Sequence, residues 1–204
     1  MMASSATAGS VEIIRWAKSK GWRVTAEVTP HHLLLTEELA SGYDPLYKVN
    51  PPLRTAADVE ALRAGLADGT IDCVATDHAP HPQEDKEAEW QAAAFGMTGL
   101  ETALRAVQEA MVETGLLDWA GVADRMSARP AAIGRLDGAH GCPLVPGSPA
   151  SLVLYDPAAR SAVDPQAHAS RSRNSPFAGM TLPGRVVATF LRGNGTVLDG
   201  KLAR

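Results

Sequence analysis

The stretch at residues 71–81, IDCVATDHAPH, decides how this chain is interpreted. An apolar, β-favouring run ends abruptly in a carboxylate and two imidazoles. This pattern predicts a buried strand whose end aims polar groups at one point, where enzymes often place their sites. Asp77 can hold a metal or carry a proton, and His81 can bind a metal or a substrate. The spacing is too short for a complete metal site, and the structural alternative for Asp77 is a turn carboxylate or helix cap.

The composition excludes several classes of protein. With 204 residues, 45% of them hydrophobic, the chain is long enough to bury a core. A net charge of -4 gives no basic footprint, so we expect no nucleic-acid partner. The two cysteines, Cys73 and Cys142, are too few for a disulfide framework and suit a reducing cytoplasm. No apolar segment approaches the roughly 18 residues that cross a bilayer, and residues 1–10 lack the pattern of a secretion signal.

Helical and strand patterns alternate through the first two thirds of the chain. Apolar residues recur at helical spacing after Ser10, which we expect to cap the first helix. Thr55 and Asp58 form a capping-box pattern, and Thr98 and Glu101 repeat it. A further segment alternates between apolar and polar side chains, as a half-buried strand does. The predicted helices cover residues 11–20, 55–69, 98–115, 119–127 and 130–136, and the predicted strands cover residues 22–29 and 71–76.

The pattern changes near Gly138. Turn-rich stretches at 141–143 and 146–149 are followed by segments that we interpret as strands. Residues 193–195 (GNG) predict a hairpin turn between the last two of them. These strands are expected over residues 151–155, 185–191 and 196–198. The sequence therefore predicts helix–strand units of a parallel α/β structure, followed by a small β appendage.

Other residues outside the opening motif could carry chemistry. His31 and His32 also follow a predicted strand, but adjacent side chains point apart, so at most one of them is expected to face a site. Asn50 can both donate to and accept from a cyclic amide, and the two prolines after it would hold its backbone. The pair Phe95–Gly96 could present backbone groups, since glycine permits close approach. Without context, Asn50 would be an ordinary turn asparagine.

The chain contains four notable motifs: residues 28–33 (VTPHHL), 48–54 (KVNPPLR), 69–81 (GTIDCVATDHAPH) and 95–96 (FG). Together they resemble the class I dihydroorotases of the amidohydrolase superfamily. Hydantoinases and allantoinases share Thr-Asp-His, whereas Asp-His-Ala-Pro-His together with Asn-Pro-Pro-Leu-Arg is typical of dihydroorotases. The resemblance implies a partial metal-dependent (β/α)8 TIM barrel over residues 1–140, made of its last βα units, and a small β-sandwich domain over residues 141–204.

The resemblance also implies roles for single residues. Asp77 would bind zinc and shuttle a proton during the reversible hydrolysis of dihydroorotate to N-carbamoyl-L-aspartate, a step of pyrimidine biosynthesis. Asn50, His81 and the pair Phe95–Gly96 would contact the substrate. His31 is not a metal ligand in this family.

The chain also departs from the family. Its paired histidines, its substrate-gripping arginine and its bridging carboxylate or carbamylated lysine have no counterpart, and Ser4 stands where a histidine ligand is expected. We therefore expect the C-terminal half of a dihydroorotase, with two intact barrel strands, Asp77 as its one zinc ligand, and no activity by itself. The alternatives are a metal-free partner of aspartate transcarbamoylase and a hydantoinase or allantoinase. A homo-oligomer is also expected as a possible assembly.

Overall fold

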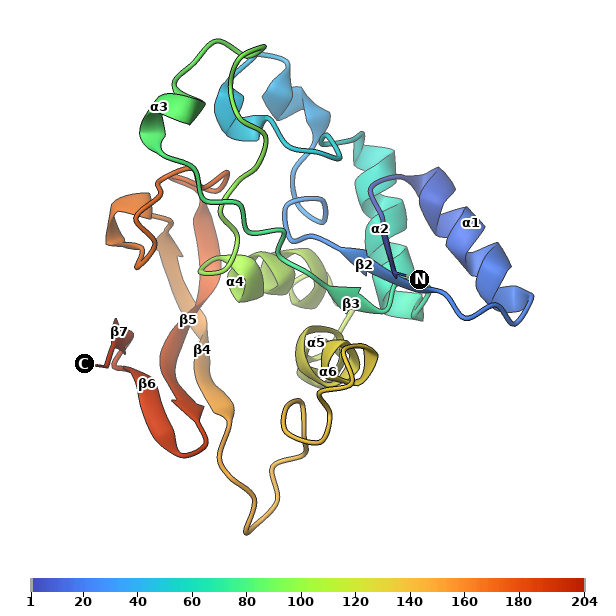
Figure 1. Cartoon of the computed structure of the whole chain (residues 1–204), viewed down its shortest axis with the longest axis vertical. Coiled ribbons are helices and arrows are strands. Elements are labelled where there is room, and N and C mark those ends of the chain that lie inside the picture. Colours follow the sequence, from blue (N-terminus) through green and yellow to red (C-terminus); the bar gives the residue numbers. More distant parts are fainter. Residues whose placement is uncertain (1, 204) are drawn as a thin grey trace.

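The computed structural model describes residues 2–203, without the side chains of residues 2 and 3. Figure 1 shows a small parallel sheet with helices packed around it and, on the other side of α4, a long antiparallel sheet. The α-helices are α1 Ala8–Ser19, α2 Ala56–Asp68, α3 Gln83–Lys86, α4 Ala103–Val107, α5 Trp119–Ala123 and α6 Arg129–Ile133. The strands are β1 Met2–Ser4, β2 Thr25–Val28, β3 Cys73–Val74, β4 Leu152–Ala162, β5 Thr181–Leu191, β6 Asn194–Leu198 and β7 Lys201–Leu202.

The parallel sheet has the order β1-β2-β3, which confirms the predicted α/β class. Glu27 pairs with Cys73 and Val28 with Val74, so β2 and β3 end side by side. Ala26 and Val28 are fully buried, and Val28 belongs to an apolar cluster with helix residues such as Leu62. The loops that follow β2 and β3 both start at the carboxyl ends of these parallel strands, where both candidate motifs lie. Beside the two expected strands, β1 is a third.

The first helix begins earlier than predicted. Its N-cap is Thr7, whose side chain accepts from the N–H of Ser10, and the Ser10 hydroxyl faces the Thr7 N–H in return. Ser10 is therefore the third helical residue and not the cap, because a serine at that position completes a reciprocal pair. The expected buried stripe of the helix is confirmed by Val11, Ile14 and Ala17.

The second helix confirms its prediction. Thr55 and Asp58 form the expected capping box, and the helix ends at Gly69, which takes a left-handed conformation with φ 85°. The Asp58 carboxylate also accepts from the N–H of Ala8 at 2.8 Å, so α2 is tied to the start of α1. Figure 1 shows these two helices side by side on one flank of the sheet.

The predicted third helix begins about five residues late. The Glu101 carboxylate does not cap it, because it accepts from the N–H groups of Ala169 and Ser170 at 2.9 and 3.1 Å. The Thr98 N–H donates to Asn174 O at 3.0 Å. Contacts across some 70 residues thus replace the local cap, which a capping-box pattern cannot anticipate. The helix continues from α4 into a π-helical turn, Gln108–Val112.

The two short helices expected next form one continuous segment. A π-helical turn, Asp124–Ala128, joins α5 to α6 without a break. Pro130 is the second residue of α6 and lies within this continuous segment, where it has no N–H to donate to the preceding turn. Three 3₁₀ turns, Glu37–Ala40, Pro45–Tyr47 and Pro165–Ala167, complete the helical elements of residues 2–203.

The antiparallel sheet has the order β4-β5-β6-β7, with β4 and β5 longer than predicted. The hairpin between β5 and β6 turns at Arg192–Gly193, one residue before the predicted GNG turn. Both residues have positive φ, 51° and 85°, which suits the twist of a two-residue hairpin.

The sheet is not isolated from the rest of the molecule. Its Leu182, together with Val163 and Phe177, shares an apolar cluster with residues of the first half such as Leu53 and Met97. The two predicted domains therefore share buried apolar contacts, and the boundary near residue 140 stays a prediction. No helix in residues 2–203 is long and apolar enough to cross a membrane.

Candidate active site

Asp77 stands just after β3 and is exposed, as a group that meets a substrate must be. Its φ of 48° lies in the left-handed region, which aspartate tolerates better than most residues. Glu27 lies on the neighbouring strand β2. Partial burial raises the pKa of Glu27 above its usual value, and the charge of Asp77 raises it further. Two carboxylates therefore face one region at the strand ends.

Glu27 was not among the sequence candidates. The alternating pattern puts it on the polar side of its strand, opposite the buried Ala26 and Val28. That alternation was the available signal, but nothing in it separates a site carboxylate from a solvated one.

The histidines after β2 are structural. His32 is 2% exposed, and its Nε2–H points to Pro51 O at 3.1 Å and Pro52 O at 3.3 Å, since a carbonyl oxygen can only accept. Its Nδ1 lies 2.7 Å from Thr29 Oγ1. His31 is 1% exposed, and burial lowers its pKa to about 3, with His32 contributing less. Within residues 2–203, His31 Nε2 has no hydrogen-bond partner.

Asn50 is exposed on the loop that His32 fixes. In the described part of the chain, no hydrogen bond joins the Asn50 side chain to Asp77 or His81. His32 lies between the Asn50 loop and Asp77: it bonds to Pro51 O and is near enough to sense the charge of Asp77. The pKa of His32 is lowered mainly by burial, and the charge of Asp77 raises it slightly. The structure thus brings the Asn50 loop to the same end of the parallel strands as Asp77, through His32.

His81 is partly exposed and contacts the other predicted backbone site. Its Nε2–H donates to Phe95 O at 2.8 Å, and its Nδ1 lies 4.0 Å from Asp85 Oδ2. The ring is therefore held against the segment that carries Gly96. The neighbouring His78 has a different role, because its Nδ1 accepts from the N–H groups of Gly99 and Leu100.

Gly96 is required by close packing. Its φ is 120°, and a Cβ at this position would stand 2.5 Å from the Ala79 Cβ. Its N–H donates to Lys48 O at 2.9 Å, and its carbonyl accepts from Lys86 Nζ and Asn174 Nδ2. Both backbone groups of Gly96 are occupied, whereas the N–H of Phe95 donates to no acceptor within residues 2–203. Of this pair, the Phe95 N–H is the donor available to a substrate.

Two buried lysines hold the segment around Phe95, and sequence reasoning missed both. Lys48 Nζ donates to Trp90 O and Ala93 O, each at 2.6 Å, and lies 4.4 Å from the centre of the Phe95 ring. Lys86 Nζ donates to Ala94 O and Gly96 O, each at 2.9 Å. Burial lowers the pKa of Lys86 to about 8, and the charge of Lys48 adds to this. Lysines are usually solvated, so no local signal marks these two.

Within residues 2–203, no group of three or more His, Cys, Asp or Glu side chains is arranged to hold a metal ion. Asp77 alone cannot hold zinc against water, because zinc sites use three or four protein ligands. The described residues therefore do not form a metal centre by themselves.

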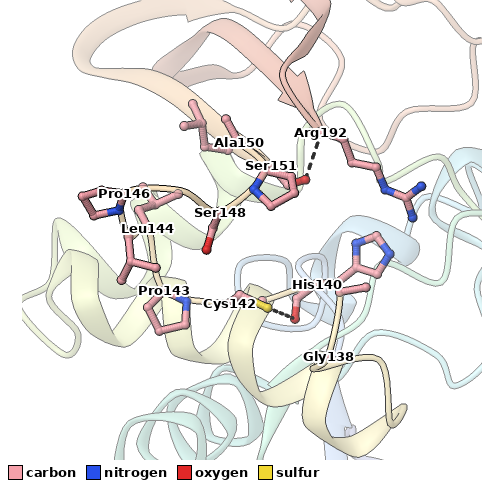
Figure 2. Close-up of a pocket in the computed structure, with 15 residues that line it drawn as sticks. Gly138, His140, Cys142, Pro143, Leu144, Pro146, Ser148, Ala150, Ser151 and Arg192 are labelled. Atoms are coloured by element: carbon pink, nitrogen blue, oxygen red, sulfur yellow. Dashed lines mark hydrogen bonds between the residues drawn. The ribbon is translucent and has the colours of Figure 1, made fainter.

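A hollow lies away from this region, between the loop before β4 and the β5–β6 hairpin (Figure 2). Its volume is about 670 Å³, and its lining includes His140, Cys142 and Arg192. Its lining residues form hydrogen bonds such as that from the Arg192 N–H to Ser151 Oγ at 3.2 Å, and Cys142 Sγ faces His140 O. A smaller hollow of about 270 Å³ adjoins His81.

Comparison with known proteins supports the motif resemblance. The chain is 69% identical over 196 residues to the dihydroorotase of Streptomyces coelicolor, covering 96% of this chain and 46% of that protein. It is 67% identical to the dihydroorotase of Leifsonia xyli, covering 95% of this chain and 44% of the relative. For the dihydroorotase of Mycobacterium tuberculosis the values are 53%, 97% and 46%. The chain spans about half the length of the curated relatives it matches, and no family model matches it.

Solved structures of related enzymes share the fold. An L-hydantoinase (dihydropyrimidinase) from Arthrobacter aurescens matches with a TM-score of 0.92 and 32% identity, covering all of this chain and 46% of that one. A D-hydantoinase from a Thermus species matches with a TM-score of 0.90 and 27% identity, covering 99% and 45%.

Proposed function

Because this chain belongs to the dihydroorotases and corresponds to their C-terminal part, we propose that it carries the proton-transfer and substrate-contacting residues of a dihydroorotase. The reaction is the reversible hydrolysis of the cyclic amide of dihydroorotate to N-carbamoyl-L-aspartate, in pyrimidine biosynthesis. The observation that carries the proposal is the exposed Asp77 carboxylate at the end of β3, beside Glu27 and next to the loop of His81.

Asp77 is the proposed proton carrier. In the hydrolytic direction it accepts a proton from the water that adds to the ring carbonyl, and it returns this proton to the leaving ring nitrogen. Glu27 lies near this carboxylate, and its own pKa is raised mainly by partial burial and further by the charge of Asp77.

Asn50, His81 and the N–H of Phe95 are the proposed substrate contacts. The Asn50 amide can pair with the ring amide, since it both donates and accepts. His81 and Phe95 are held together by their own hydrogen bond, so they would act as one preformed surface. Gly96 contributes by allowing the close approach of its segment to Ala79.

Zinc is the proposed metal, with Asp77 as one ligand. The described residues offer no set of ligands around Asp77, so the other ligands have to come from outside them. In the same proposal, the parallel sheet is part of a (β/α)8 barrel and the antiparallel sheet is part of a β-sandwich domain. The cytoplasm is the proposed location. The proposed partners are the substrate, further copies of the protein or aspartate transcarbamoylase.

A joined protein tests this function. It consists of the part of the Streptomyces coelicolor dihydroorotase that this chain does not cover, followed by residues 1–204. Zinc content and turnover of dihydroorotate, hydantoin and allantoin are measured side by side. We expect zinc binding and a preference for dihydroorotate. Preference for hydantoin or allantoin would replace the substrate, and a zinc-free protein that co-purifies with aspartate transcarbamoylase without turnover would overturn the proposal.

A further inference from the structure

We propose that Asn174 is a positioning residue, which fixes the loop of His81 against the Phe95–Gly96 segment and thereby sets the substrate-contacting surface. The inference rests on the proposed function for its effect on catalysis, and on hydrogen bonds alone for its structural part. Asn174 belongs to the segment between β4 and β5, more than 90 residues beyond His81 in the sequence.

The side chain of Asn174 uses both ends of its amide. Its Nδ2 donates to Ala79 O at 2.9 Å and to Gly96 O at 3.3 Å, and its Oδ1 accepts from the His81 N–H at 3.3 Å. The residue is 5% exposed, so these bonds are largely shielded from water. One side chain therefore bridges two loops that have no covalent connection near this point.

The backbone of Asn174 adds a fourth contact, because its carbonyl accepts from the Thr98 N–H at 3.0 Å. Lys86 Nζ, at the end of α3, donates to the same Gly96 carbonyl as Asn174. The two loops also contact each other directly through the Ala79 N–H and Met97 O at 3.0 Å. Asn174 thus adds the last link to a set of hydrogen bonds that already joins the two loops. Its side chain is therefore held in one defined orientation.

The contacts of Asn174 indicate whether it affects substrate binding or proton transfer. They fall on the residues proposed to contact substrate, His81 and the Phe95–Gly96 segment, and none falls on Asp77. Loss of the bridge should therefore weaken substrate binding more than proton transfer. Supporting residues of this kind commonly change affinity or activity by about 10–100-fold.

The test is Asn174→Asp in the joined protein. This change keeps the shape but removes both donors, and it sets a carboxylate oxygen against two carbonyl oxygens. We expect KM for dihydroorotate to rise by about 10–100-fold, with kcat within a few-fold and the zinc content unchanged. Asn194→Asp, the same chemical change on an exposed strand residue, is the matched control and should leave KM unaltered.

A second measurement does not depend on activity. Hydrogen exchange of the Ala79 and Gly96 amides should become about tenfold faster or more in Asn174→Asp than in Asn194→Asp. The lost donors bond to the carbonyls of these two residues, and the amides themselves donate across the same loop junction to Met97 O and Lys48 O. Asn174→Ser, with a smaller polar side chain, should change exchange in the same direction if Asn174→Asp does not fold. Unchanged exchange would overturn the positioning role. Faster exchange with unchanged KM would overturn only its link to substrate binding, and an inactive parent protein would count against the proposed function instead.

Discussion

The two strand ends of the parallel sheet carry similar sequences but differ in what their polar groups do. After β2, His31 and His32 are 1% and 2% exposed. Both ring nitrogens of His32 are hydrogen-bonded, one to Thr29 and the other to the Pro51 and Pro52 carbonyls. After β3, the Asp77 side chain is exposed, so solvent and small molecules can reach this strand end. Both motifs are a strand followed by titratable residues. Of His31, His32 and Asp77, only Asp77 has an exposed side chain.

The difference shows that a strand end with imidazoles is not by itself a site. Buried imidazoles serve as hydrogen-bonding spacers between loops, whereas a site needs an accessible group on a backbone that is fixed from behind. The end of β2 provides that support, since His32 holds the Asn50 loop. One strand end therefore supports a neighbouring loop, and the other carries the exposed carboxylate on which the proposed function rests.

The sharpest test of this comparison is Asp77→Asn in the joined protein. Asparagine tolerates the left-handed backbone at this position as well as aspartate, so the fold should be retained. If Asp77 is the proton carrier, as proposed, this change should lower kcat by about 10²- to 10⁴-fold. Steady-state kinetics and a thermal unfolding scan are the measurements.

The counterpart at the other strand end is His31→Phe, which keeps a buried ring of similar size. We expect its kcat to stay within a few-fold of the parent protein, because His31 is sealed from any substrate. If His31→Phe slowed the reaction as much as Asp77→Asn, the division between the two strand ends would be wrong.

The site could be predicted from the sequence only where local pattern controls geometry. The apolar run before Asp77 predicts the strand that ends there. The order of the motifs along the chain supports the family resemblance. Lys48 and Asn174 could not be found in this way, because their partners lie 42 or more residues away in the chain. Whether a polar residue near a motif is buried and bridging is a property of tertiary packing.

The fold divides along the same line. The helix after Thr55 followed its sequence signals at both ends, since its cap and its terminal glycine act within a few residues. The helix expected from Thr98 did not, because Glu101 is used by a segment nearly 70 residues further on. Local rules hold until a distant group offers a better hydrogen-bond partner.

The buried histidines after β2 should make the free energy of unfolding decrease in acid. Burial lowers the pKa of His31 from 6.5 to about 3. The unfolded chain binds this proton below pH 6.5 and the folded chain only near pH 3, so protons favour unfolding across this window. Between pH 7 and pH 4, His31 should cost about 3 kcal/mol of the free energy of unfolding.

Urea unfolding of the joined protein at several pH values measures this cost. His31→Phe should remove part of the acid sensitivity, and His32, whose pKa burial also lowers, should account for a further part. His140→Phe, on an exposed loop, serves as the control and should leave the pH profile as it is. An unchanged profile in His31→Phe would show that this imidazole takes up its proton in the folded state as readily as in the unfolded one.

The smallest expected effect concerns the support behind the exposed strand end. Gly96→Ala adds a Cβ that would meet the Ala79 Cβ at 2.5 Å, at a φ of 120° that other residues rarely adopt. We expect a loss of about 2 kcal/mol in the free energy of unfolding, from strain and overpacking. Gly42→Ala has open space and an unstrained backbone, so it should be close to neutral in the same urea titration. Because Ala79 lies between Asp77 and His81, a rise in KM with Gly96→Ala would show that the loop of β3 acts through its packing, whereas equal stability of the two variants would mean that this end is loosely held and that exposure alone separates it from the end of β2.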